Sequence, residues 1–186
     1  MRTTSQPEGF GRPESMIECG WRLWRNAPVG KSPLSSVLEC TDHCPALIDL
    51  VGGTSALGRF LAATRVDVVD EEGYLWVDDD DGTISICSSY LREGPEQEII
   101  IDLVHELVHV HQQSQGRPLY DKRYAYVDRP TEIEAYAVCI KEARRLGLSE
   151  AQIVNYLRVP WVSAAEHLRL CAHLSLRVLP AHSPSP

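Results

Sequence analysis

The chain of 186 residues lacks any uninterrupted apolar run of about 18 residues, the length that a helix needs to cross a bilayer. Its first residues also lack the apolar stretch of about 7–15 residues that marks a secretory signal peptide. We therefore expect a cytoplasmic protein with no membrane partner. Positive charge is scarce as well, because 18 Lys and Arg face 26 Asp and Glu, which leaves a formal net charge of −8. Such a surface repels phosphate backbones, so we expect no nucleic-acid partner.

Disulfides are not expected, although the chain has six cysteines. An even number would suit a small secreted protein, but cysteines in a chain without a secretory signal are more often reduced thiols. Cys40 and Cys44 form a Cys-x3-Cys pair, which offers too few ligands for a structural zinc site.

The composition is that of an ordinary globular protein, with 44% hydrophobic and 24% charged residues. Residues 1–30 are rich in Pro, Gly, Ser and Thr and show no hydrophobic period, which predicts a mobile N-terminal arm, from which Trp21 and Trp24 could dock onto the body. Residues 31–178 carry the patterned sequence of one domain, and residues 179–186 are expected to be a disordered tail.

Helical and strand patterns alternate in blocks within this domain. Helical spacing over 47–61 precedes three short β-prone runs, 65–69, 74–77 and 83–90, whose Asp- and Gly-rich separators predict a three-stranded antiparallel meander. Helical patterns then return: a long, mostly apolar segment that starts near Pro95, a helix over 131–146, and two short helices. The two short helices begin with the capping-box pairs Ser149–Gln152 and Ser163–Glu166. This order predicts an α+β fold.

The long apolar helix contains His105-Glu106-Leu107-Val108-His109, an HExxH motif. Residues at i and i+4 share one face of a helix, so both imidazoles can bind one zinc ion. Glu106 would then lie beside the metal and act as a general base toward a water molecule. Buried histidines and a glutamate in an apolar helix need such partners, because uncompensated burial of polar groups is unfavourable.

A third ligand is expected from the segment PTEIEAYA at 130–137, which offers Glu132 and Glu134. If Thr131 is the N-cap, Glu134 completes a capping box with it, and Glu132 is the carboxylate left to face the metal. A helix that starts at Arg129, with Pro130 in its first turn, would weaken this reasoning and leave Glu134 open as the ligand.

HELVH followed by E-x-E-A-x-x-A in the next long helix resembles the gluzincin zinc metallopeptidases, and it is most similar to their ImmA/IrrE-type family. The resemblance covers roughly residues 65–146. It implies a zincin-like domain, in which a small antiparallel sheet packs on the active-site helix and further helices follow. It also implies one zinc ion per chain bound by His105, His109 and Glu132, and a protein or peptide substrate, such as a regulatory protein, whose backbone binds along a strand.

Further residues are candidates for supporting roles. Asp102 lies three residues before His105 on the same helix face and can orient its ring. Tyr120, Tyr124 and Tyr126 lie between the two ligand segments, where one hydroxyl could stabilise an oxyanion. Tyr136 comes one helical turn after Glu132.

The sequence thus favours a hydrolase, a zinc metallopeptidase in which Glu106 is catalytic. The strand expected over 83–90 would bind the substrate backbone by strand addition. Two alternatives remain open. One is an HExxH metalloenzyme with non-peptidase chemistry, for example iron-dependent oxidation, since iron accepts the same ligands. The other is a non-catalytic, zinc-containing regulatory or binding protein.

Overall fold

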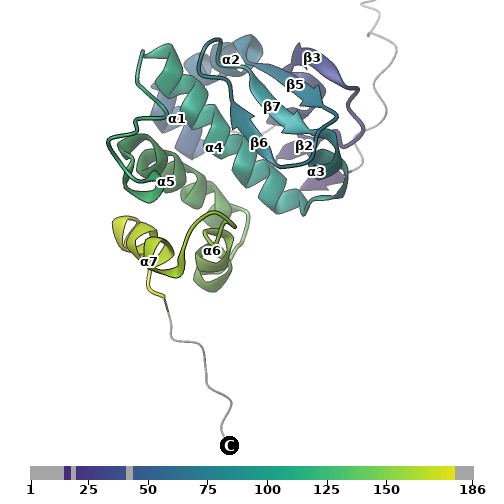
Figure 1. Cartoon of the computed structure of the whole chain (residues 1–186). Coiled ribbons are helices and arrows are strands. Elements are labelled where there is room, and N and C mark those ends of the chain that lie inside the picture. The colour runs from purple at the N-terminus through teal and green to yellow at the C-terminus, as the bar shows by residue number, and fades with distance from the viewer. Residues whose placement is uncertain (1–14, 18–19, 41–43, 179–186) are drawn as a thin grey trace, which may run out of the picture.

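The computed structural model describes residues 15–17, 20–40 and 44–178, and its fold is α+β, as expected (Figure 1). The larger sheet has the strand order β3-β5-β7-β6, formed by Gly30–Pro33, Arg65–Val69, Ile84–Cys87 and Leu75–Val77. Strands β5 and β7 are parallel, whereas the two outer pairs are antiparallel.

The meander expected over 65–90 is wrong. Strand β7 lies between β5 and β6, and residues 88–93 form helix α3 (Ser88–Glu93) instead of extending the strand. The physical reason is burial: Ile84 and Ile86 of β7 are fully buried, so the most apolar strand takes a central place. The half-exposed strand β6, with Trp76 40% exposed, forms the edge.

The hydrogen bonds of the edge strand β6 show which of its backbone groups face away from β7. Cys87 donates its N–H to the carbonyl of Tyr74, and Asp78 donates to that of Thr83, which fixes the antiparallel register with β7. Because backbone groups alternate along such a ladder, Leu75 and Val77 turn their N–H and C=O groups away from β7. The hydroxyl of Tyr120 donates to the outward carbonyl of Val77 at 2.7 Å.

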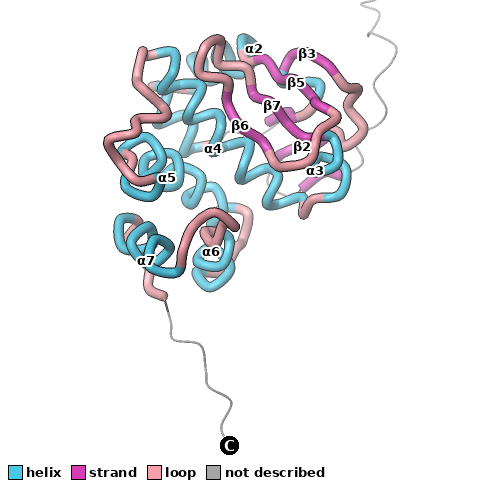
Figure 2. The backbone as a smooth tube through the Cα atoms, in the orientation of Figure 1, coloured by secondary structure: helices cyan, strands magenta, loops and turns pink. Residues whose placement is uncertain are grey.

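Helix α4 (Glu96–Ser114) crosses the centre of the molecule, between the four-stranded sheet and the C-terminal helices (Figures 1 and 2). Glu96 and Glu98 lie in its first turn, where carboxylates complement the helix dipole. Most of its residues from Ile99 to His109 are buried, which explains the nearly continuous apolar sequence.

Three further helices follow α4. Helix α5 (Pro130–Arg145) packs against α4, and the shorter helices α6 (Glu150–Tyr156) and α7 (Ala164–His173) complete the chain. Both capping boxes expected for the short helices are present, in each case with the serine side chain accepting from the third helical N–H. Short 3-10 helices occur at Leu34–Ser36 (η1) and Tyr126–Asp128 (η2).

The expectation of a mobile arm over 1–30 is wrong for its second half. Strands β1 (Ser15–Ile17), β2 (Trp21–Leu23) and β4 (Leu38–Cys40) form a small antiparallel sheet. Trp21 is only 1% exposed, and its indole donates to the buried carboxylate of Glu142 in α5 at 2.5 Å. Sequence composition could not reveal this partner 121 residues away. Residues 1–14 and the expected tail at 179–186 lie outside the described residues.

Helices α1 (Pro45–Val51) and α2 (Thr54–Ala63) cover the far side of α4 and the sheet (Figure 1). Within the described part of the chain, no single helix has the length and apolar character needed to cross a membrane. Only α1 and α2 taken together reach that length and composition, and the pair is bent by 89°.

Candidate metal centre

His105, His109 and Glu132 converge on one buried point between α4 and α5 and form a group that could hold a metal ion. The two Nε2 atoms lie 3.0 Å apart. Oε2 of Glu132 lies 3.3 Å from Nε2 of His105 and 3.5 Å from Nε2 of His109. The three residues are 6%, 6% and 4% exposed, so the point where they meet is shielded from solvent.

The two spacings to Glu132 fit a tetrahedral zinc site, whereas the 3.0 Å between the two Nε2 atoms is shorter than such a site requires. Zinc binds imidazole nitrogen and carboxylate oxygen at about 2.0–2.2 Å, which places the ligand atoms of a tetrahedron about 3.3–3.5 Å apart. In addition, Oε2 of Glu132 is buried and has no hydrogen-bond partner. A buried carboxylate oxygen without a donor is unfavourable, and a cation at this point would supply the missing interaction.

Gln112 holds the ring of His109 in the orientation that a metal needs. Its amide nitrogen donates to the carbonyl of Thr131 at 3.1 Å and to the carboxylate of Glu134 at 2.8 Å. The amide oxygen must then be the atom 2.8 Å from Nδ1 of His109, so Nδ1 carries a proton. When His109 loses its other proton, as a metal ligand must, it therefore presents the lone pair of Nε2 toward Glu132 and His105.

Electrostatics keep Glu132 ionised. Burial alone would favour its protonated form, but the imidazoles of His105 and His109 hold the pKa of Glu132 down to about 2. Burial likewise opposes the protonation of His109, yet the contact with Glu132 raises the pKa of His109 to about 9. The guanidinium of Arg129 lies 4.0 Å from the other oxygen, Oε1. The carboxylate thus has one oxygen near Arg129 and one facing the histidines.

The structure separates the two carboxylates of α5, but not for the reason expected from the sequence. The expected capping box of Thr131 and Glu134 is absent, because the helix begins at Pro130 with Arg129 as N-cap and no side-chain cap. Glu134 instead pairs with Arg117 at the half-exposed end of the site and accepts from Gln112. It supports His109 through Gln112 and lies outside the three-residue group.

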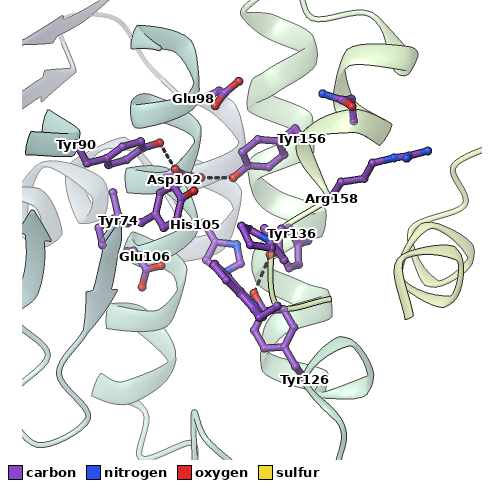
Figure 3. Close-up of a pocket in the computed structure, with 15 residues that line it drawn as sticks. Tyr74, Tyr90, Glu98, Asp102, His105, Glu106, Tyr126, Tyr136, Tyr156 and Arg158 are labelled. Atoms are coloured by element: carbon purple, nitrogen blue, oxygen red, sulfur yellow. Dashed lines mark hydrogen bonds between the residues drawn. The ribbon is translucent and has the colours of Figure 1, made fainter. Parts of the chain in front are cut away.

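Glu106 lies on the same helix, in a cavity bordered by His105 (Figure 3). It is 9% exposed, and burial raises the pKa of its carboxyl group to about 8. The charge of His109 opposes this rise, and the backbone of Val77 in the edge strand opposes it to a smaller extent. A buried, basic carboxylate next to a candidate metal ligand is the arrangement expected of a general base.

The tyrosines that follow α4 take different places. The hydroxyl groups of Tyr126 and Tyr136 lie 2.7 Å apart, and the ring of Tyr136 lies edge-on to His105 with centroids 4.5 Å apart. Both tyrosines border the same cavity as Glu106. Tyr124 is 43% exposed and is not among the residues bordering this cavity, and Tyr120 binds the edge strand.

Asp102 also faces the cavity, but its recorded hydrogen bonds do not involve His105. Its two oxygens accept from the hydroxyls of Tyr90 and Tyr156, each at 2.5 Å (Figure 3). Neither tyrosine could be recognised from the sequence. Tyr90 belongs to a segment expected to be a strand, and Tyr156 lies 54 residues after Asp102 in the chain. Gln112 could have been found by its spacing, three residues after His109 on the same helix face.

Comparison of the chain with protein-family models, with curated protein sequences and with solved structures finds no match.

Proposed function

We propose that this protein is a zinc-dependent metallopeptidase that hydrolyses a peptide bond in a protein substrate. The observation that carries the proposal is the meeting of His105, His109 and Glu132 at one buried point between α4 and α5, with the carboxylate of Glu106 next to His105 on α4. The order HExxH on one helix and Glu on the next supports the resemblance to the gluzincins noted from the sequence.

The residues of the site can share the steps of hydrolysis. When bound, zinc would polarise the substrate carbonyl and make a water molecule more acidic. Glu106 takes the proton from the attacking water and passes it to the amine nitrogen that leaves. The hydroxyl pair of Tyr126 and Tyr136 offers a donor for the oxygen that becomes negative as water attacks.

The edge strand β6 is the strand we assign to the substrate backbone. The strand expected from the sequence, β7, is paired on both sides and has no open edge. In β6, the groups that point away from β7 belong to Leu75 and Val77. The outward backbone groups of Val77 face Glu106 and Tyr120, and Leu75 borders the cavity beside His105. An extended peptide pairing with Leu75 would therefore reach the catalytic residues.

The substitution Glu106→Gln tests the proposal. It keeps the size of the side chain but removes its basicity, so zinc content and folding should be retained while the rate of peptide cleavage falls by about 10²–10⁴-fold. Metal analysis identifies the bound metal, and mass spectrometry of candidate proteins incubated with the zinc-loaded chain detects cleavage.

Glu39→Gln is the matched control, because Glu39 is an exposed residue of β4 that pairs with Arg22. This variant should retain full activity. Bound iron in place of zinc, or cleavage that Glu106→Gln does not slow, would refute the proposed mechanism.

A further inference from the structure

A cavity of about 260 Å³ opens beside His105 and Glu106 (Figure 3). This volume is below the range of about 300–1,000 Å³ that is typical of sites for drug-sized ligands. It suits one amino-acid side chain. Because Leu75 of the edge strand also borders the cavity, a peptide bound to that strand would direct a side chain into it.

Five aromatic side chains that line this cavity form a series of neighbouring rings, here called the aromatic belt. Tyr90 packs edge-on to Tyr74 with centroids 5.2 Å apart, and Tyr74 packs on Trp161 at 6.1 Å. Trp161 in turn contacts Tyr126 at 6.2 Å, and Tyr126 contacts Tyr136 at 6.4 Å. Aromatic faces attract cations and the methylene groups that carry them.

The ionisable side chains on the cavity wall are mostly acidic. Asp102 and Glu98 lie one turn apart on α4, and Glu106 lies one turn beyond Asp102. Arg158 also borders the cavity, but its side chain extends away from Asp102 and Glu98 (Figure 3). Each oxygen of Asp102 accepts one tyrosine hydroxyl and retains a further lone pair for a guest donor.

We propose that this cavity is a specificity pocket for a positively charged substrate side chain, lysine or arginine, at a position flanking the scissile bond, with Asp102 as its specificity-determining residue. The inference rests on the proposed peptidase function. An uncharged apolar side chain would also fit the aromatic belt, but it would leave the charge of Asp102 without a counter-ion.

A matched pair of peptides tests the pocket. The zinc-loaded protein is first incubated with a randomised peptide library, and mass spectrometry identifies the residues on both sides of each cleaved bond. A preferred peptide is then compared with its analogue in which norleucine replaces lysine, because norleucine keeps the length and loses the charge. We expect kcat/KM to favour the lysine peptide by about 10- to 30-fold.

Asp102→Asn should reduce this preference to near unity, since asparagine keeps the shape and can still hydrogen-bond to the tyrosines. Asp49→Asn is the control for charge, because Asp49 is an exposed residue of α1 and does not border the cavity. It should leave the preference unchanged. Should Asp102→Asn fold poorly, Glu98→Gln at the same wall should reduce the preference by a smaller factor, and its folding is checked by circular dichroism.

Binding to the Glu106→Gln variant separates failure of the pocket from failure of the peptidase proposal. Tighter binding of the lysine peptide than of the norleucine peptide, without any cleavage by the wild type, would support the pocket and refute the peptidase. Cleavage or binding that is indifferent to charge, or that favours aliphatic or aromatic side chains, would refute the pocket alone.

Discussion

The two carboxylates at the start of α5 lead to a sharp prediction about metal affinity. Glu132 contributes a buried oxygen to the three-residue group, whereas Glu134 accepts from Gln112 and pairs with Arg117 at the surface. Glu132→Gln should therefore weaken zinc binding strongly, because a neutral amide oxygen replaces a charged ligand. Glu134→Gln should bind zinc nearly as well as the wild type, because a glutamine oxygen can still accept from Gln112.

The size of the zinc-induced rise in Tm follows from the linkage between metal binding and folding. Free zinc at about 1,000 times its Kd stabilises the folded chain by about 4 kcal/mol. For a domain of this size, each kcal/mol raises Tm by about 2–4 °C, so zinc should raise the Tm of the wild type by about 8–16 °C. A 100-fold loss of affinity in Glu132→Gln would remove about 2.7 kcal/mol of this stabilisation, and with it about 5–11 °C.

Differential scanning fluorimetry with and without zinc, after removal of metal by a chelator, measures this rise for each variant. The difference between the two conditions cancels any effect of the substitution on the metal-free fold. His109→Ala serves as a reference that lacks a ligand. If Glu134→Gln lost the zinc-induced rise and Glu132→Gln retained it, the assignment of the third ligand would be wrong.

Two further predictions concern buried groups that are not metal ligands. Glu142 is fully buried and accepts from Trp21, Arg145 and Cys44, so Glu142→Gln should destabilise the protein by about 2–3 kcal/mol and lower Tm by about 4–12 °C. Burial raises the pKa of Glu142, but Arg145 and Trp21 lower it by more, so that it lies below its usual value of 4.5. The ionised carboxylate therefore stabilises the fold above pH 4.5, and this stabilisation is lost as the pH falls through the lower pKa of the folded state. Acid titration of the wild type and of Glu142→Gln measures the difference. Burial raises the pKa of Cys44 to about 12 and that of Cys139 well above its usual value, so both thiols should resist alkylation in the folded protein and react after unfolding, as peptide mapping would show.

Local sequence signals predicted the longer helices and the two capped short helices, but not α3. The capping boxes at Ser149 and Ser163 are short-range devices whose partners lie three residues apart, so the sequence contains the whole interaction. The HExxH motif is similar, because helical geometry alone brings His105 and His109 to one face. The third ligand needed tertiary information, and Glu132 was selected from the sequence by a capping argument that the structure contradicts.

Long-range features were beyond the sequence. The pairing of β5 with β7 depends on which strand is buried most deeply, and turn chemistry near Asp78 fixes only the neighbouring hairpin. Composition and the lack of a hydrophobic period predicted a mobile arm from which Trp21 could dock, but no local pattern connects Trp21 with its partner Glu142 on α5.

The residues of the proposed active site and of the proposed pocket come from partly different segments of the chain. The three candidate metal ligands and Glu106 come from α4 and the first turn of α5, inside the segment 65–146 that resembles the gluzincins. Tyr156, which donates to Asp102, comes from α6, and Trp161, which packs on Tyr74 in the aromatic belt, comes from the segment after α6. Substitutions in this later segment can therefore alter the pocket without displacing a metal ligand. Under the proposed function, α4 and α5 would supply the residues of the reaction together with Asp102 of the pocket, and α6 and the segment after it would complete the pocket.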